Sequence, residues 1–286
     1  AKTIAAFREI NTNPAGKIGI ILNLTPSYPA TEEPEDLAAA SFANLWMNDM
    51  FLDAAVKGAF PQELVATFEE DGVLWNATTE ELQLIGENTI DVLGVNFYHP
   101  NRVQRPSVSA DSLAVDWMPS RYFEEYAMPG RRMNVDKGWE IYPQSLYDIA
   151  LNIRDNYGNI PWFVSENGMG VSREERYLNT EGMIEDDYRI QFIQEHLYWV
   201  AKGIEEGSNC FGYHLWTPID CWSWGNAYRN RYGFISNNIH TQVKTIKKSG
   251  YWFKGVSEVG KLEVPDAIVE KWGEPALDFD AAQAVF

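Results

Sequence analysis

The sequence predicts an α/β protein whose parallel strands alternate with helices. Short apolar runs of strand type recur four times along the 286 residues, each followed by a loop and a longer segment of helical periodicity, and this order is typical of β–α–β units. Polar and aromatic residues gather at the ends of these strands, where α/β sheets place their active sites. No glycine-rich phosphate-binding turn follows a strand. We therefore expect half of an eight-stranded (β/α)8 barrel rather than a doubly wound nucleotide-binding sheet.

The first half of the chain holds two of the four expected strands. They lie at 18–22 (IGIIL) and at 90–97 (IDVLGVNF). Apolar residues recur at three- and four-residue steps over 35–57, which predicts a long helix between these strands. Shorter helices are expected at 62–70 and 79–86, because a proline opens the first and a threonine followed by acidic residues opens the second.

The second half begins with a long stretch, residues 99–139, that is rich in Pro, Ser, Arg and Met and has little periodicity. Loops of this length are commonly functional. The helix expected at 186–206 is the clearest in the chain, with one apolar stripe and a capping aspartate, Asp186 or Asp187, at its start. The other elements expected here are a helix at 143–157, strands at 161–165 and 210–216, and a helical tail from 245.

Composition excludes several classes of protein. The chain is 45% hydrophobic, which rules out a disordered protein, and no apolar run approaches the roughly 20 residues that a membrane helix needs. A net charge of −18 argues against nucleic-acid binding, which needs basic patches. Two cysteines are too few for a disulfide framework, and no signal segment opens the chain. We expect a cytoplasmic protein with a single domain over residues 1–286, and no membrane partner.

Polar side chains follow the second and third expected strands. Glu166 stands directly after an apolar run, at the strand end where catalytic residues of α/β folds are found, although a loop-capping role is equally consistent with this position. Asn96 and Tyr98 end the second strand, where capping and packing are the simpler interpretation of these two residues by themselves.

Aromatic and hydrogen-bonding residues are interleaved over 213–232 (YHLWTPIDCWSWGNAYRNRY). Flat aromatic faces against sugar C–H groups, flanked by polar side chains, suit a carbohydrate site. An aromatic core beneath a loop is the alternative, and we expect three of the five aromatic residues Trp216, Trp222, Trp224, Tyr228 and Tyr232 to lie in the core. The four histidines show no metal-ligand spacing with carboxylates, so neither a metal nor another cofactor is expected.

Together these segments resemble glycoside hydrolase family 1. The motifs that carry the resemblance lie at 94–98 (GVNFY), 139–144 (WEIYPQ), 163–168 (FVSENG), 186–190 (DDYRI) and 216–220 (WTPID). Their order and spacing agree from near residue 1 to about residue 257. The resemblance implies the C-terminal half of a (β/α)8 TIM barrel, with strands five to eight.

The resemblance also implies roles for individual residues. Glu166 matches the nucleophile that attacks the anomeric carbon in a retaining mechanism. Tyr98 matches the tyrosine that hydrogen-bonds this nucleophile and favours its charged form, and Asn96 lines the same strand end. Trp216 matches the platform under the glycone sugar, and its bond to Thr217 is expected to be the family's cis peptide.

The expected substrate class depends on Ser223. Ordinary family members carry a glutamate there that binds O4 and O6 of the sugar, and a carboxylate would repel a 6-phosphate, whereas a hydroxyl can donate to it. Phospho-glycosidases of the family resemble this pattern and add a lysine and a tyrosine. Tyr232 matches the tyrosine, but Asn230 stands at the lysine position.

The arginines that flank Asn230, Arg229 and Arg231, are expected to compensate for the lost charge. Trp224 is similar to the galactoside-accepting branch, so gluco and galacto preference both stay open. The expected substrate is a 6-phospho-β-glucoside or 6-phospho-β-galactoside, and such sugars arise from uptake-coupled phosphorylation, which again implies a cytoplasmic enzyme.

The family's general acid/base lies in an Asn-Glu-Pro motif, which does not occur in this sequence. We therefore expect a fragment or one chain of a split enzyme, with the N-terminal half as a partner, and weak activity at best when isolated. A non-catalytic half-barrel that binds sugars or phosphosugars, ordinary β-glucosidase specificity, and a purely structural interaction module are the alternatives.

Overall fold

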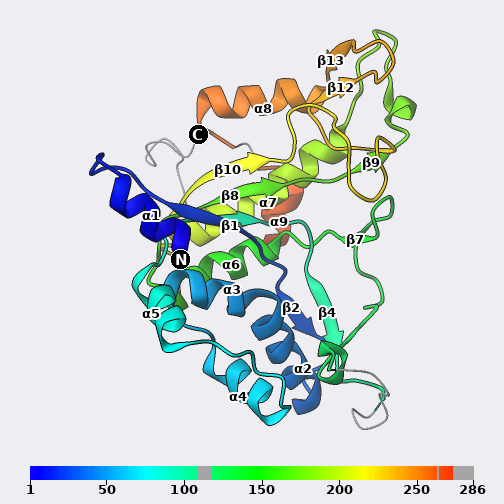
Figure 1. Ribbon diagram of the computed structural model, residues 1–286. Helices are drawn as coiled ribbons and strands as arrows, with labels where there is room; N and C mark the ends of the chain where they lie inside the picture. Colours follow the sequence, from blue (N-terminus) through cyan, green and yellow to red (C-terminus); the bar gives the residue numbers. More distant parts are fainter. Residues whose placement is uncertain (109–116, 263, 273–286) are drawn as a thin grey trace. The chain divides into compact units, whose positions relative to one another are not determined.

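The computed structural model describes residues 1–108, 117–262 and 264–272 (Figure 1). The chain divides into two compact units. The first contains Ala1–Val95, Pro100–Gly130 and Asp155–Pro161, and the second contains Asn96–His99, Arg131–Arg154 and the chain from Trp162 onward. Every residue singled out above as a candidate for catalysis or substrate binding belongs to the second unit.

The first unit holds the first two of the expected strands, β1 (Gly19–Asn23) and most of β3 (Val92–Asn96), which lie side by side. A β-carbon on Gly19 would lie 2.2 Å from the Val92 carbonyl oxygen, so this approach requires glycine. Three further helices are α1 (Lys2–Ile10), α4 (Gln62–Glu70) and α5 (Thr79–Glu87), and a small sheet has the order β2 (Ser27–Pro29), β4 (Asn101–Gln104), β5 (Glu124–Glu125), with the short η4 (Pro119–Arg121) before β5.

The long helix expected at 35–57 is one helical run interrupted by π turns. It consists of α2 (Pro34–Asn44), η1 (Leu45–Asp49), α3 (Met50–Leu52) and η2 (Asp53–Lys57). Asn44 and Asn48 use their side chains to bond the backbone of Ser27 and Thr25, at 2.7–3.0 Å. Asn44 and Asn48 lie just before and within the π turn η1. The periodicity of the apolar residues predicts a helix here but not this π turn.

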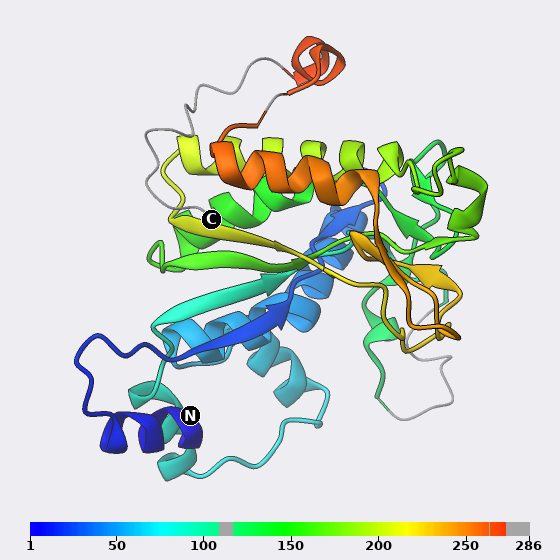
Figure 2. The ribbon, with the colours of Figure 1, turned by 90° about the horizontal axis from the view of Figure 1, so that it is seen from above.

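The second unit is built on β8 (Trp162–Asn167) and β10 (Cys210–Leu215), which are parallel and pair Cys210 with Trp162 and Leu215 with Asn167. The helix α6 (Gln144–Asn156) precedes β8, and α7 (Asp187–Glu205) connects the two strands. Figure 2 shows α8 (Lys248–Val259) beside α7 on one face of these strands. The middle of the predicted stripe of α7 is buried, with Ile193 fully enclosed, while its ends at Ile190 and Ile204 are partly exposed.

Short strand pairs carry the loops of this unit. They are β6 (Met133–Asn134) with β7 (Trp139–Glu140), β9 (Val171–Ser172) with β11 (Asn230–Arg231), and β12 (Ile235–Asn237) with β13 (Lys244–Ile246); η5 (Glu174–Tyr177) and α9 (Asp266–Trp272) are short helices. The expected loop at 99–139 therefore contains strands of two to four residues in its described part, too short to leave a periodic signal. Residues 109–116 of that stretch lie outside the described residues. Over the described part of the chain, no helix is long and apolar enough to cross a membrane.

A half-buried carboxyl group lies in the first unit, at Asp49 in η1. The Tyr157 hydroxyl donates to it at 3.2 Å, and Asp53 pairs with Lys57 at 2.8 Å nearby in the sequence. Burial, aided by the charge of Asp53, raises the pKa of Asp49 to about 6, against the opposing effects of Tyr157 and Lys57. The folded chain therefore holds a proton here that the unfolded chain releases at lower pH.

Replacement of Asp49 by Asn is expected to flatten the pH dependence of stability. The raised pKa means that the wild-type free energy of unfolding falls as pH rises from about 4 to about 6, by up to roughly 3 kcal/mol. Asn keeps an acceptor for Tyr157 but does not titrate. Urea unfolding at pH values between 4 and 7 measures the effect, with the exposed Glu69→Gln as control; parallel profiles for Asp49→Asn and wild type would contradict the assignment.

Candidate active site

Glu166 lies near the carboxyl end of β8, next to the segment that follows β3. The Tyr98 hydroxyl donates a hydrogen bond to Glu166 Oε2 at 2.5 Å. The two segments are also joined by the Phe97 N–H, which donates to the Glu166 carbonyl at 2.9 Å, and by the Ser165 hydroxyl, which donates to Asn96 Oδ1 at 2.8 Å. The structure thus brings Asn96, Tyr98 and Glu166 together.

Tyr98 is held in its neutral, donating form. Burial raises the pKa of the Tyr98 hydroxyl well above its usual value, and the hydrogen bond to Glu166 adds to this effect. Its ring packs 5.2 Å from the Trp139 ring, centroid to centroid. A phenol that keeps its proton can orient the carboxylate and stabilise its charge.

Asn167 joins three segments around Glu166. Its fully buried side chain donates to the Phe97 carbonyl at 2.8 Å and accepts from the Tyr213 hydroxyl at 2.6 Å. Its carbonyl accepts the Trp216 N–H at 2.9 Å. Asn167 therefore ties the end of β8 to the segment after β3 and to β10.

Trp216 is 38% exposed, and its peptide bond to Thr217 is cis, as expected. A β-carbon on Gly168 would lie 2.2 Å from the Trp216 carbonyl oxygen. Only glycine permits this approach, so Gly168 sets how close the tryptophan segment lies to the end of β8.

Ser223 and Tyr232 face each other with 3.4 Å between their hydroxyl oxygens. Tyr232 is buried, and a β-carbon on Gly170 would lie 2.5 Å from its Cζ. Trp224, in contrast, is 93% exposed. Of the five aromatic residues between 216 and 232, only Tyr232 is buried, so the expectation of three core residues is wrong. The segment forms a loop turned back by a bridge between Ser223 and Ala227, which leaves the tryptophans outside.

Asn230 is fully buried and pairs with Ser172 between β11 and β9. Its Nδ2 donates to the Asp136 carbonyl at 3.0 Å. The side chain of Arg231 contacts the Asn237 carbonyl at 3.4 Å, and Arg229 is exposed. Asn230 therefore holds the backbone at Asp136 and supplies no positive charge at this position.

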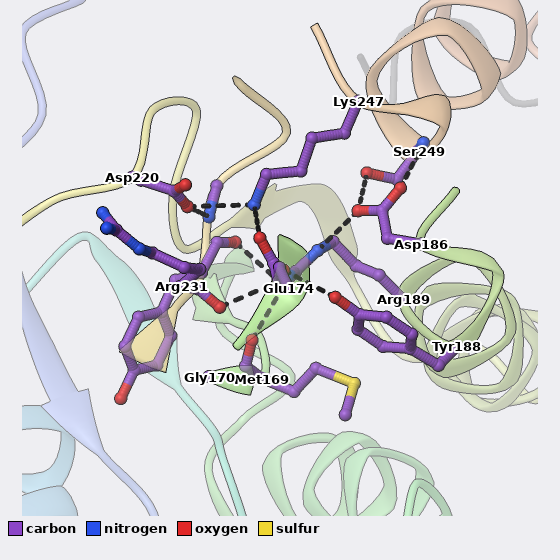
Figure 3. A network of polar contacts seen from close by, with 12 residues as sticks. Met169, Gly170, Glu174, Asp186, Tyr188, Arg189, Asp220, Arg231, Lys247 and Ser249 are labelled. Atoms are coloured by element: carbon purple, nitrogen blue, oxygen red, sulfur yellow. Dashed lines mark hydrogen bonds and ion pairs between the residues drawn. The ribbon is translucent and has the colours of Figure 1, made fainter. Parts of the chain in front are cut away.

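A buried ion network lies beneath these loops (Figure 3). The Arg189 guanidinium, on α7, donates to Glu174 at 2.5 Å and to Asp186 at 2.9 Å. Lys247 donates to Glu174 and, at 3.0 Å, to Asp220. Asp186 stands at the N-cap of α7, as expected, but its carboxylate bonds Ser249 and Arg189 instead of capping the helix.

The network also binds the backbone on either side of the site. Arg189 donates to the carbonyl oxygens of Met169 at 2.7 Å, Tyr232 at 3.0 Å and Arg231 at 3.2 Å. Asp220 accepts the Gly233 N–H at 2.8 Å. The network thus fixes the backbone at Tyr232 and at the residues on either side of it, Arg231 and Gly233. Among the described residues, no group of three or more His, Cys, Asp or Glu side chains could hold a metal ion.

Comparison with known proteins identifies the family. The family model of glycosyl hydrolase family 1 matches residues 1–261. The chain belongs to glycosyl hydrolase family 1. It is 52% identical over 259 residues to the 6-phospho-beta-glucosidase GmuD of Bacillus subtilis, covering 90% of this chain and 55% of that protein. It is 31% identical over 277 residues to a 6-phospho-beta-galactosidase of Clostridium acetobutylicum, covering 92% and 57%.

Solved structures of this family share the fold. The family 1 β-glucosidase from Thermotoga maritima superposes with a TM-score of 0.77 at 28% identity, over 92% of this chain and 55% of that one. The predicted fold class is confirmed, since the family 1 chain has the α/β architecture of the C-terminal half of a TIM barrel. The chain spans about half the length of the curated relatives it matches.

Sequence reasoning did not single out Asn167, Gly168 or Gly170. The glycines at 168 and 170 directly follow the Glu166 strand, and such spacing signals a close approach of other backbone. Asn167 carried no signal of its own, because its three partners come from distant parts of the chain.

Replacement of Lys247 by Met is expected to destabilise the family 1 chain by about 3–5 kcal/mol, because it removes the cation paired with the buried Asp220 and leaves Glu174 with Arg189 alone. Its neighbour Lys248 is the matched control. That side chain forms an exposed ion pair with Asp187, so Lys248→Met should change the free energy of unfolding by less than about 0.5 kcal/mol. Urea unfolding measures both; similar small losses in the two variants would show that the network contributes little.

Proposed function

We propose that this chain supplies the nucleophile for hydrolysis of 6-phospho-β-glycosides with retention of configuration. The observation that carries the proposal is the hydrogen bond from Tyr98 to Glu166 at a strand end. It orients a partly exposed carboxylate. Trp216, whose N–H bonds the carbonyl of the next residue, Asn167, is exposed and offers a face for the sugar ring.

The chemistry follows from the carboxylate. Glu166 forms a bond to the anomeric carbon as the bond to the leaving-group oxygen breaks, and that oxygen takes a proton from a general acid. Water then cleaves the glycosyl ester and restores the carboxylate. Retention needs a second carboxyl group about 5 Å from the first. No Asn-Glu-Pro motif occurs in these 286 residues, so we infer that sequence outside them provides the acid.

The phosphate is assigned to Ser223 and Tyr232. Two hydroxyl groups 3.4 Å apart can both donate to one phosphate oxygen, and no carboxylate stands at position 223 to repel it. Relatives named as a 6-phospho-beta-glucosidase and a 6-phospho-beta-galactosidase support this substrate class. A relative named Beta-glucosidase A, from Acetivibrio thermocellus, is 31% identical over 255 residues, which makes β-glucosides without phosphate the second candidate.

The role of Glu166 is tested with Glu166→Gln. The chain is mixed with the separately produced N-terminal half of its Bacillus subtilis relative and assayed on 4-nitrophenyl 6-phospho-β-glucoside and 6-phospho-β-galactoside. We expect hydrolysis by the mixture, and a loss of roughly 10³-fold or more in kcat with Glu166→Gln. The exposed Glu175→Gln is the control. Full activity in the isolated chain would overturn the assignment of the acid to another segment, and binding without any hydrolysis would favour a non-catalytic phosphosugar-binding half-barrel.

The role of Ser223 is tested by placing a carboxylate there. Ser223→Glu is expected to weaken binding of the phosphorylated glucoside by about 10–100-fold through like-charge repulsion, while binding of the unphosphorylated glucoside holds or improves. Titration calorimetry with both ligands measures the ratio, and Ser257→Glu, in exposed α8, controls for the added charge. An unchanged ratio of the two dissociation constants would show that Ser223 does not contact the phosphate.

A further inference from the structure

Lys137 places a positive charge beside the residues assigned to the phosphate. It lies in the turn between β6 and β7, where the N–H groups of Lys137 and Gly138 bond the Asn134 carbonyl at 3.2 and 2.8 Å. Its Nζ lies 4.3 Å from the centroid of the Trp139 ring and 6.0 Å from that of Tyr232. The ammonium group is therefore near the ring whose hydroxyl faces Ser223.

The described residues do not neutralise the charge of Lys137. Within the described residues, no carboxylate forms an ion pair with it. The adjacent Asp136 carboxylate instead accepts from the Ser172 hydroxyl at 2.5 Å and N–H at 3.1 Å, and lies 3.8 Å from Arg176. An aromatic face attracts an ammonium group by about 0.5–1 kcal/mol at a partly exposed site, and the three N–H donors stay available for an anion.

The turn that carries Lys137 is fixed to the same frame as Tyr232. Asn134 Nδ2 donates to the Gly170 carbonyl at 3.1 Å, and Gly170 lies against the Tyr232 ring. Asn230 Nδ2 donates to the carbonyl of Asp136, the residue before Lys137. Gly170 directly precedes β9 and Asn230 lies in β11, the strand that leads into Tyr232. The turn of Lys137 is therefore positioned by the same strand pair as Tyr232.

We propose that Lys137 is the cationic contact for the substrate's phosphate and acts with Ser223 and Tyr232; this inference rests on the proposed function. Asn230 is the positioning residue that holds the turn. A charge-assisted bond from an ammonium to a phosphate oxygen is stronger than a bond between neutral groups. Lys137 thus distinguishes phosphorylated from unphosphorylated sugars.

The test compares Lys137→Met, which keeps an apolar stem against Trp139 and removes the charge, with Lys137→Arg, which keeps the charge. Titration calorimetry of the full chain measures the dissociation constants of 4-nitrophenyl 6-phospho-β-glucoside and of the same glucoside without phosphate. Lys137→Met is expected to weaken the phosphorylated ligand by about 10–100-fold and to leave the other within about twofold. Lys137→Arg should stay within about fivefold of wild type for both ligands. Lys244→Met removes an exposed charge from β13 and is the matched control.

The outcomes separate this inference from the function on which it rests. A wild-type chain that binds both glucosides equally overturns both proposals. A wild-type preference for the phosphorylated ligand that Lys137→Met fully retains overturns the role of Lys137 and leaves the proposed function standing. Equal weakening of both ligands in Lys137→Met would assign the lysine to packing, which also overturns its role as the phosphate contact.

Discussion

The guanidinium of Arg189 is the interaction on which the site depends. It has almost no access to solvent, and it bonds two carboxylates and three carbonyl groups that come from four separate segments of the second unit. Burial alone would lower the pKa of Arg189, but Glu174 and its other anionic neighbours raise it above the usual value. The planar five-donor fork of arginine allows this pattern, and a lysine with three donors could not replace it.

The buried network orders the loops but offers no net positive charge to an anion. Its two cations, Arg189 and Lys247, face three carboxylates, Glu174, Asp186 and Asp220, so the five charges sum to −1. The chain as a whole carries −18. Neither the net charge of the protein nor that of the buried network would therefore attract a phosphorylated sugar. An anionic substrate requires a local cation that is not already paired.

The sequence predicted the regular elements of the fold because their patterns are local. The apolar stripe of 186–206 became α7, and the run before Glu166 became β8. The site was predicted in part: the strand end located Glu166, whereas the Tyr98 contact came from family resemblance. The π turns at Leu45–Asp49 and Asp53–Lys57 were not predicted, nor was the β6–β7 hairpin. The amide side chains at the first of these turns, Asn44 and Asn48, bond distant backbone. Two-residue strands show no periodicity, so local sequence patterns predict neither feature.

The cost of burying a charge explains why a lysine stands at position 137 and not at position 230. Position 230 is fully enclosed, and the side-chain partner that the described residues give it is a carbonyl, so an ammonium group there would lose its hydration without a carboxylate among those residues to offset the loss. An amide at that position satisfies the Asp136 carbonyl at much lower cost. Lys137 lies in a partly exposed turn, where its ammonium group rests on the face of Trp139 and is only partly removed from water. A positive charge in the turn thus costs less desolvation than one on the enclosed strand, and an anion that it contacts there is more open to screening by salt.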